Sequence, residues 1–213
     1  MAERLVSLII GYFLGIIQTS YIIGKTKGID IRKHGSGNAG TTNAIRIMGI
    51  KTGVITFICD CFKCIIAVII VHFLFKERFP EYVRLLRLYA ATGAILGHNF
   101  PFYLKFKGGK GIACTAGLLA SYYLPLGLVA LFVFVLVFGT TNYVSLGSLA
   151  INIVFLVGTI IMGVTGIMEM PFPYVIEMFV LAAFICAMAF WRHRANIGRL
   201  IAGTENKTYL CKL

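Results

Sequence analysis

Acidic side chains are scarce in this sequence of 213 residues. Eight Asp and Glu stand against 20 Lys and Arg, and the aspartates are Asp30 and Asp60 alone. Metal-dependent membrane phosphotransferases need several aspartates on facing helices, so this scarcity argues against that class. No histidine has an aspartate five residues after it, and no serine or cysteine lies in a nucleophile-elbow pattern. The sequence therefore offers no obvious carboxylate base.

Charged residues of either sign make up only 13% of the chain, while 59% is hydrophobic and the mean hydropathy is +0.88. Soluble proteins carry about 25% charged residues. We therefore predict an integral membrane protein with a single membrane-embedded domain over residues 1–213, because the length leaves no room for a soluble domain. The net charge of +12 indicates basic cytoplasmic loops facing anionic lipid, and we expect the lipid bilayer and no nucleic acid as partner.

Six cysteines are present, and Cys59, Cys61 and Cys64 form a short cluster within an apolar run. No histidine or fourth cysteine lies near them, so we interpret them as small buried hydrophobic residues and expect no metal and no cofactor. The first apolar stretch lacks a small-residue cleavage site ahead of a polar segment. It is predicted to be a membrane span rather than a removable signal.

Apolar runs of about 20 residues predict membrane spans at about 5–24, 52–75, 85–97, 144–168 and 174–191. The run 112–138 is either one helix or two short helices broken at Pro125 and Gly127. With a break, the chain crosses seven times and 14 Lys and Arg collect on one side, against four or five on the other. The positive-inside rule then places the N-terminus outside and the C-terminus in the cytoplasm.

The predicted fold class is therefore all-α, with seven transmembrane helices of which two are short and flank Pro125. A 13-residue helix rises only about 20 Å. The fourth helix must therefore begin inside the preceding loop, lie where the protein is thin, or dip partway into the membrane.

Residues 34–46 fit neither a period of 2 nor one of 3.6, so we predict a loop. They contain three glycines, five side chains with a hydroxyl or carboxamide, and a terminal Arg46. Glycines allow backbone N–H groups to turn inward, and short polar side chains add hydrogen bonds. Two interpretations stay open from this stretch alone: a phosphate site, or a solvated turn between two membrane helices.

Two further polar clusters fall on the same predicted cytoplasmic side, at about 97–111 and 192–205. Gly-Gly-Lys-Gly at 108–111 would bring amide groups, a helix N-terminus and Lys110 to one point. A nucleotide P-loop needs Ser or Thr after the lysine, and Gly111 stands there instead. The basic tail could be a topological anchor, although His193, Asn196 and Glu205 are less expected in one.

Two features lie inside predicted spans. Asp60 and Lys63 are three residues apart on one helix face and can neutralise each other, so we interpret them as a structural ion pair. Ser145 and Ser148 stand at a helix start, where serine is more often a cap than a ligand.

The three clusters, in this order and spacing, resemble those of bacterial membrane acyltransferases that use acyl phosphate to acylate glycerol 3-phosphate. The resemblance covers nearly the whole chain. It rests on Gly-Ser-Gly-Asn-Ala-Gly-Thr-Thr-Asn at 35–43 with Arg46, on Gly97-His98 leading to Phe-Lys-Gly-Gly-Lys-Gly at 106–111, on Arg-His-Arg-x-Asn-Ile-x-Arg-Leu at 192–200 with Gly203-x-Glu205, on Asp60-x-x-Lys63, and on Ser145-x-x-Ser148.

The resemblance implies a seven-helix protein of the bacterial inner membrane with its active site facing the cytoplasm. It implies transfer of a fatty acyl group to the sn-1 hydroxyl of glycerol 3-phosphate, giving lysophosphatidate and phosphate. The substrate's own phosphate would accept the proton, which agrees with the missing carboxylate base. The soluble enzyme that makes acyl phosphate is a candidate partner.

The resemblance also implies site residues. Those for acyl phosphate are Ser36, Gly37, Asn38, Gly40, Thr41, Gly108 and Gly109. Those for glycerol 3-phosphate are Arg46, Lys110, Ser148, His193 and Asn196. The catalytic set would be Ser36, Arg46, Lys110, His193 and Asn196, whereas Asp60, Lys63 and Glu205 would be structural.

Departures from the family pattern are modest. Thr41 stands where the family often has alanine, which leaves open whether Thr41 or Thr42 contacts phosphate. The competing hypothesis is a transporter of a small phosphorylated anion. It is disfavoured because the chain halves show no repeat and the polar clusters gather on one face.

Overall fold

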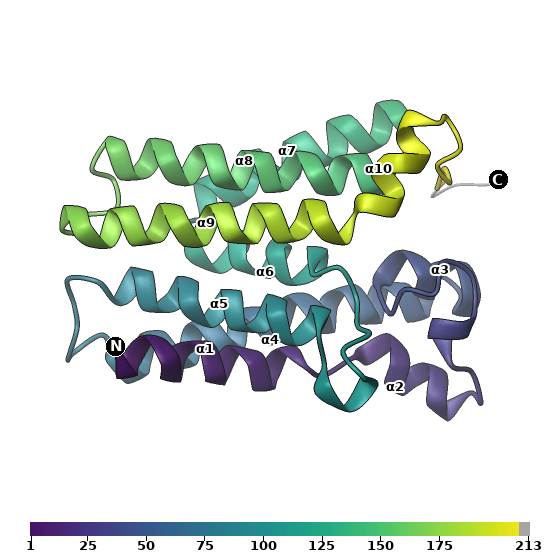
Figure 1. Ribbon diagram of the computed structural model, residues 1–213, viewed down its shortest axis with the longest axis horizontal. Helices are drawn as coiled ribbons and strands as arrows, with labels where there is room; N and C mark the ends of the chain where they lie inside the picture. Colours follow the sequence, from purple (N-terminus) through teal and green to yellow (C-terminus); the bar gives the residue numbers. More distant parts are fainter. Residues whose placement is uncertain (209–213) are drawn as a thin grey trace.

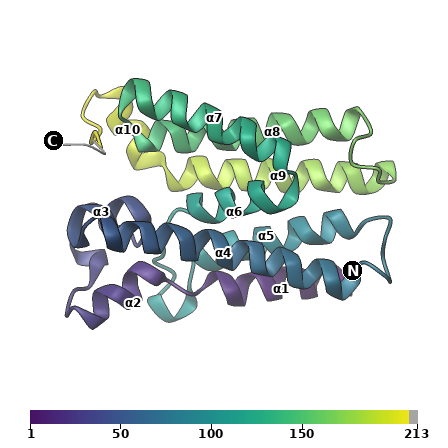
Figure 2. The ribbon, with the colours of Figure 1, turned by 180° about the vertical axis from the view of Figure 1, so that it is seen from behind.

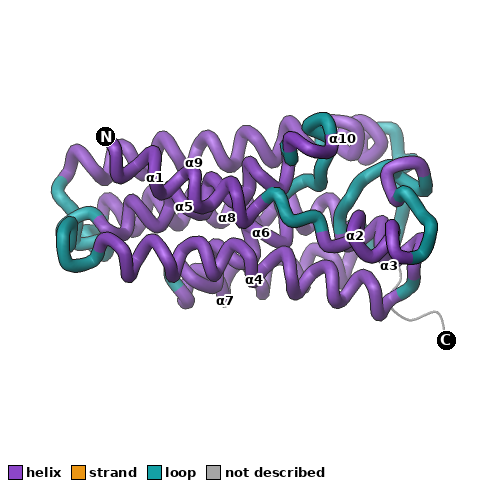
Figure 3. Tube along the Cα trace, turned by 90° about the horizontal axis from the view of Figure 1, so that it is seen from below, coloured by secondary structure: helices purple, strands orange, loops and turns teal. Residues whose placement is uncertain are grey.

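The computed structural model describes residues 1–208, and within them the chain forms helices, turns and loops without any strand (Figure 3). Lys212, one of the predicted tail cations, lies outside the described residues. The α-helices are α1 Ala2–Gly15, α2 Thr19–Thr26, α3 Thr41–Met48, α4 Ile50–Phe75, α5 Val83–Asn99, α6 Ile112–Tyr122, α7 Leu124–Thr141, α8 Val144–Val164, α9 Phe172–Arg192 and α10 Arg194–Ile201, with 3-10 turns at Ile31–Lys33 and Phe102–Leu104.

Five helical stretches within residues 1–208 are long and apolar enough to cross a membrane. They are Ala2–Thr26, Ile50–Phe75, Leu124–Thr141, Val144–Val164 and Phe172–Arg192. Many of their large apolar side chains are exposed, such as Phe73 and Phe132, which suits contact with lipid. The prediction of an all-helical integral membrane fold is confirmed.

The helices run side by side along one long axis (Figures 1 and 2). The short helices α2, α3 and α10 gather at one end, which we call the α10 end. The N-terminus and the α4–α5 and α8–α9 connections lie at the opposite end, which we call the N-terminal end. All three predicted polar clusters therefore have residues at or near the α10 end.

The apolar run 112–138 is two helices, as the predicted break at Pro125 requires. The chain turns at Tyr123, and Pro125 lies in the first turn of α7, where its missing N–H costs no helical hydrogen bond. With 11 residues, α6 rises about 16 Å. Figures 1 and 2 show the α6–α7 turn inside the length of the bundle, well short of the N-terminal end.

One local prediction was wrong. Residues 34–46 are not a loop throughout, because Thr41–Met48 forms α3 with Asn43 and Ala44 on its buried side. The first predicted span lies within the helical stretch Ala2–Thr26, which has a break between the end of α1 at Gly15 and the start of α2 at Thr19. The carbonyl of Ile17 in this break accepts a hydrogen bond of 2.7 Å from the Lys63 ammonium.

Helices α1 and α5 pack at very short distance because glycines line their contact. A Cβ built on Gly11 would lie 1.9 Å from the Ala90 carbonyl oxygen, and one on Gly93 would lie 2.1 Å from the Leu8 oxygen. Gly15 and Gly97 are equally crowded by the opposite backbone. Small residues allow this close backbone approach between membrane helices, where dispersion replaces the hydrophobic effect as the driving force.

We expect Gly93→Ala to destabilise the protein by at least about 3 kcal/mol, because the added Cβ meets backbone that cannot move aside as a side chain could. Thermal unfolding in detergent measures the change. Gly139→Ala in α7 is the matched control, since nothing lies within 4 Å of its added methyl group. Equal melting temperatures of the two variants would contradict this account of the α1–α5 contact.

Candidate active site

Asn43 fixes the turn that presents Ser36. Its side-chain oxygen accepts a hydrogen bond of 3.0 Å from the Ser36 amide, and its Nδ2 donates to the carbonyl of His34 at 3.0 Å. Gly35 and Gly37 have φ of 57° and 70°, which favour glycine. Asn43 itself is buried. Ser36 is exposed at the surface of this turn, with its hydroxyl making no hydrogen bond to any residue in 1–208.

The first turn of α3 carries a second free hydroxyl. The Oγ1 atom of Thr41 is buried and has no hydrogen-bond partner within residues 1–208. Gly40 precedes it as the N-cap, with the Asn38 amide nitrogen 3.1 Å from where a Cβ of Gly40 would lie. Arg46 stands in the last turn of the same helix and is exposed. Helix α3 thus carries polar groups at its start and a cation at its end.

The loop between α5 and α6 is held in a strained shape. Lys105 and Phe106 have φ of 55° and 59°, a left-handed conformation that costs non-glycine residues about 1–3 kcal/mol each. Backbone hydrogen bonds from both residues to Pro101 and Phe102 hold the turn, and Arg32 donates to the Leu104 carbonyl at 3.3 Å. This last bond ties the segment before Ser36 to the second cluster.

Gly108 and Gly109 lie directly on His98. A Cβ on Gly109 would be 1.9 Å from Nε2 of His98, and one on Gly108 would be 2.1 Å from the His98 carbonyl oxygen. The amides of both glycines already donate, to the carbonyls of Asn99 and His98 at 3.2 and 3.0 Å. These two amides are therefore bonded to backbone carbonyls of Asn99 and His98.

A buried polar cluster lies beneath this glycine contact. Lys63 and Asp60 form an ion pair of 2.7 Å, and both side chains are at most 5% exposed. The Lys63 ammonium also lies 2.9 Å from Nδ1 of His98. Because an ammonium can only donate, this nitrogen accepts and His98 is neutral. Gln18, in the break between α1 and α2, donates to the His98 carbonyl at 2.9 Å.

Arg192, at the end of α9, joins the glycine contact to the tail. Its guanidinium donates to the carbonyls of Gly108, at 3.1 Å, and of Gly109. The same group lies 5.3 Å from the centre of the Phe100 ring. The guanidinium thus fixes the backbone that leads directly into Lys110.

Lys110 and the tail form one hydrogen-bonded network. The Lys110 ammonium donates to the side-chain oxygen of Asn196, and Asn196 donates to Glu205 at 2.6 Å. Glu205 also accepts from Ser145 at 2.9 Å and from Arg199 at 2.6 Å. Burial raises the pKa of Glu205, but these three hydrogen bonds outweigh it and hold the pKa below its usual value.

His193 is buried beside Lys110 and neutral. Burial, together with the charge of Lys110, lowers its pKa to about 4. Its Nδ1 lies 2.8 Å from the Ala189 carbonyl oxygen, which can only accept, so the proton is on Nδ1. The other nitrogen, Nε2, is therefore a hydrogen-bond acceptor.

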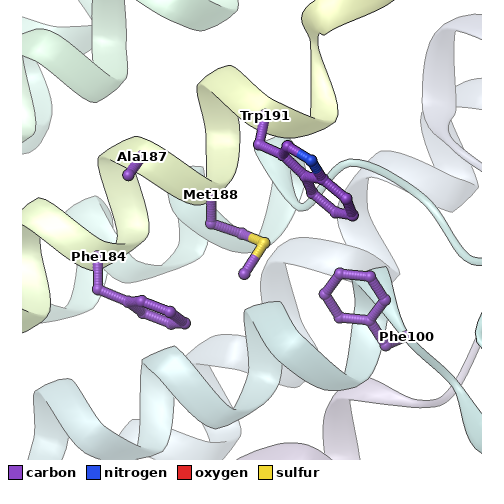
Figure 4. Close-up of a pocket in the computed structure, with 5 residues that line it drawn as sticks. All are labelled: Phe100, Phe184, Ala187, Met188 and Trp191. Atoms are coloured by element: carbon purple, nitrogen blue, oxygen red, sulfur yellow. The ribbon is translucent and has the colours of Figure 1, made fainter.

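An apolar pocket of about 380 Å³ opens next to this network. Phe184, Ala187, Met188 and Trp191 of α9 line it on one side and Phe100 on the other (Figure 4). Phe100 is also the ring that contacts Arg192, whose guanidinium donates to the Gly108 and Gly109 carbonyls. No group of three or more His, Cys, Asp or Glu side chains in residues 1–208 could hold a metal ion.

The structure joins some of the predicted site residues and separates others. Lys110, Asn196 and Glu205 are directly bonded, and His193 is next to them. The residues from Ser36 to Arg46 lie at the same end but have no hydrogen bond to the tail within residues 1–208. Ser148 donates back to the Val144 carbonyl at 2.7 Å inside α8.

Several residues that position the site were absent from the predicted set. They are Asn43, His98, Ser145, Arg192 and Arg199. Each stands inside a motif that sequence analysis singled out, and its polar character there was the available signal. The contacts of His98, Ser145 and Arg192 come from distant parts of the chain, whereas the bonds of Asn43 to Ser36 and of Arg199 to Glu205 lie within ten residues.

Apolar helices long enough to cross a membrane, with a cluster of cations and hydrogen-bonding groups at one end, define an integral membrane protein. The family model described as glycerol-3-phosphate acyltransferase matches residues 5–203. The chain belongs to the glycerol-3-phosphate acyltransferase family, and the resemblance drawn from its motifs is confirmed.

Relatives and solved structures agree with this family. The glycerol-3-phosphate acyltransferase of Shouchella clausii (strain KSM-K16) is 40% identical over 97% of each chain. That of Clostridioides difficile (strain 630) is 39% identical over 93% of this chain and 92% of its own. Crystal structures of PlsY (YgiH), an integral membrane glycerol 3-phosphate acyltransferase, match at 32% identity. The glycerol 3-phosphate form has a TM-score of 0.82 and covers 97% and 96% of the two chains. The lysophosphatidic acid form has a TM-score of 0.79 and covers 97% and 95%.

Burial lowers the pKa of Lys110 to about 8. An ordinary lysine titrates at about 10.4. We therefore expect the Lys110 amine to reach half of its maximal reactivity near pH 8. Competitive labelling with acetic anhydride, read by mass spectrometry, measures this value against a free lysine amide in the same tube. A midpoint at the value of the free amide would show that Lys110 is not desolvated.

Proposed function

We propose that this chain transfers a fatty acyl group from acyl phosphate to the sn-1 hydroxyl of glycerol 3-phosphate, giving lysophosphatidate and inorganic phosphate. The observation that carries the proposal is the network of Lys110, Asn196 and Glu205, which holds a cation beside neutral His193 and next to an apolar pocket. The family supports the acceptor. The choice of acyl phosphate as donor rests on the motif resemblance.

We further propose seven crossings of a bacterial inner membrane, with the N-terminus outside and the α10 end in the cytoplasm. The split of residues 112–138 into α6 and α7 and the excess of Lys and Arg in the loops of the α10 end support this topology. A cytoplasmic site would be reached by glycerol 3-phosphate and by a soluble enzyme that delivers acyl phosphate.

Glycerol 3-phosphate is proposed to bind between Lys110 and Arg46, whose charges complement its phosphate. Nε2 of His193 is available as an acceptor for a glycerol hydroxyl, and Asn196 holds Lys110 in position. Ser148 offers its oxygen as a further acceptor. Because the Lys110 amine loses its charge above pH 8, affinity for the acceptor should fall there.

The phosphoryl group of acyl phosphate is proposed to bind at the turn from Ser36 to Thr41, including Gly37, Asn38 and Gly40. The unpartnered hydroxyls of Ser36 and Thr41 support this, and the buried Oγ1 favours Thr41 over Thr42 as the ligand. Gly108 and Gly109 would contribute by leaving room for the phosphoryl group, since their amides already donate to the backbone.

The proposed reaction needs positioning more than activation, because acyl phosphate is already a reactive mixed anhydride. The sn-1 oxygen of glycerol 3-phosphate attacks the acyl carbonyl carbon, and the bond from this carbon to the phosphate oxygen breaks. The hydroxyl proton passes to a phosphate oxygen of the substrate, so no protein carboxylate is needed. Fixed cations and hydroxyls offset the charge of the leaving phosphate.

The apolar pocket is proposed to hold the first carbons of the acyl chain. Its volume of about 380 Å³ is lined by Phe100 and by four residues of α9, and Phe100 contacts the Arg192 guanidinium that binds the Gly108 and Gly109 carbonyls. The acyl group could therefore enter from lipid while its phosphate stays at the polar network.

Ser36→Ala and Arg46→Ala should each lower acyl transfer at least about a hundredfold, because each removes a group that offsets phosphate charge. Both residues are exposed, so folding should be unaffected. The rate of lysophosphatidate formation from acyl phosphate and labelled glycerol 3-phosphate is measured with purified protein in lipid. Lys51→Ala, an exposed cation at the same end, is the control and should retain activity. Near-normal turnover in either variant would remove that residue from the site.

The same assay tests the donor and the class of protein. Acyl phosphate is replaced by a thioester of the same chain, and product from the thioester alone would overturn the proposed donor. Uptake of labelled glycerol 3-phosphate into sealed vesicles without product would identify a transporter instead.

Ala187→Trp should lower kcat/KM for a long-chain acyl phosphate at least tenfold relative to butyryl phosphate, because the indole would fill the apolar pocket. Val180→Trp, on the exposed face of the same helix, is the control. If both variants give the same ratio of long-chain to short-chain activity, the pocket does not hold the acyl chain.

A further inference from the structure

A second pocket lies near the N-terminal end of the bundle, away from the network of Lys110 and the tail. Val68, Ile69 and His72 of α4, Arg87 of α5 and Ser121 of α6 line it, and its volume is about 170 Å³. Ile69 is 46% exposed, so the pocket opens toward the lipid-facing surface. Unlike the pocket beside α9, this one contains two basic side chains.

Arg87 is only partly satisfied in this pocket. One terminal nitrogen donates to the Ser121 carbonyl at the end of α6, and the guanidinium lies 5.8 Å from the centre of the Tyr122 ring. Its Nε is buried and has no hydrogen-bond partner within residues 1–208. Nδ1 of His72 is likewise buried without a partner there. Two donor-capable groups therefore face the same small space.

Three other cations at this end have carboxylate partners; Arg78 has none within residues 1–208, but it is exposed. Arg4 pairs with Glu177 at 2.6 Å, Lys76 with Glu77 at 3.5 Å and Arg84 with Glu169 at 3.7 Å, which makes three such pairs. Arg87 has no carboxylate within 4.0 Å among residues 1–208. A partly buried cation without a counter-ion is costly in a membrane protein, so the site favours an anion from outside the chain.

The α6–α7 turn explains why this site is open to lipid. Because α6 stops after 11 residues, the two helices do not reach the N-terminal end (Figures 1 and 2), and apolar residues in the last turns of α4, such as Phe73 and Leu74, are exposed. His72 is in the last turn of α4 and Arg87 is in the second turn of α5. Both are thus near the level at which lipid headgroups begin.

We propose that the pocket of His72, Arg87 and Ser121 binds the phosphate group of a membrane phospholipid. A guanidinium binds phosphate oxygens through several N–H groups at once, and Arg87 lines the pocket without a carboxylate partner in residues 1–208. The acyl chains of the lipid lie along the exposed apolar residues of α4. The site is separate from the proposed acyl transfer and does not depend on it.

The test uses the full chain, purified in a non-ionic detergent and phosphate-free buffer and stripped of lipid. Phosphatidylglycerol is titrated while the melting temperature is followed, and bound lipid is counted by native mass spectrometry. The wild type should bind the added phosphatidylglycerol, and its melting temperature should rise by several degrees. Arg87→Gln should need about ten times more phosphatidylglycerol for the same shift, as expected for loss of a charge-assisted hydrogen bond.

Arg84→Gln is the matched control, since Arg84 is one turn away on α5 and has its own carboxylate partner. It should titrate like the wild type. If Arg87→Gln does not fold, His72→Ala carries the same comparison. The proposal would be overturned if the pocket variant and the wild type gave equal titrations. It would also be overturned if diacylglycerol, which lacks phosphate, raised the melting temperature of the wild type as much as phosphatidylglycerol does. Inorganic phosphate giving the full shift would overturn a lipid as the source.

Discussion

The buried ammonium of Lys63 is the interaction on which the candidate active site depends. Its nitrogen has three polar neighbours: the Asp60 carboxylate, with which it forms an ion pair of 2.7 Å, and Nδ1 of His98 and the carbonyl of Ile17, to which it donates hydrogen bonds. Asp60 balances its charge, and the bond to Nδ1 holds the imidazole on which Gly109 lies. The bond to Ile17 satisfies a carbonyl in the break between α1 and α2. One side chain thus links helices α1, α4 and α5 to the loop before Lys110.

Close approach of backbones at glycines is the second feature that positions the candidate active site. Gly11 and Gly93 bring α1 against α5, and Gly109 brings the loop against His98. In both places the glycine matters for the room that it leaves rather than for an unusual dihedral angle. The same packing positions the C-terminal ends of α1 and α5 and the loop that follows α5. Arg192 then fixes this loop to α9, and Glu205 fixes the tail to Lys110.

The fold class and the helix break near Pro125 could be predicted because they depend on local composition: apolar run length, loop charge and proline. The break between α1 and α2 could not, since it falls in an apolar run and its partner, Lys63, is 46 residues away. Helix α3 was missed because its eight residues are too few and too polar to show a helical period. The motifs grouped Lys110 and Asn196 in one predicted substrate site, and a hydrogen bond joins them in the structure. The bonding of the Gly108 and Gly109 amides to the carbonyls of Asn99 and His98 depends on tertiary contact, which spacing along the chain does not reveal.

Helix α7 has only Leu126 and Ala130 buried among its 18 residues. Its lipid-facing positions are constrained by hydrophobicity and by little else, so evolution can exchange one apolar residue for another there at almost no cost. The helix is consequently the natural place for a reporter. A fluorophore or spin label on its outer face would report on the surrounding lipid while leaving the polar network untouched. Most of the α7 surface therefore faces lipid, and its sequence should change faster in evolution than that of α5.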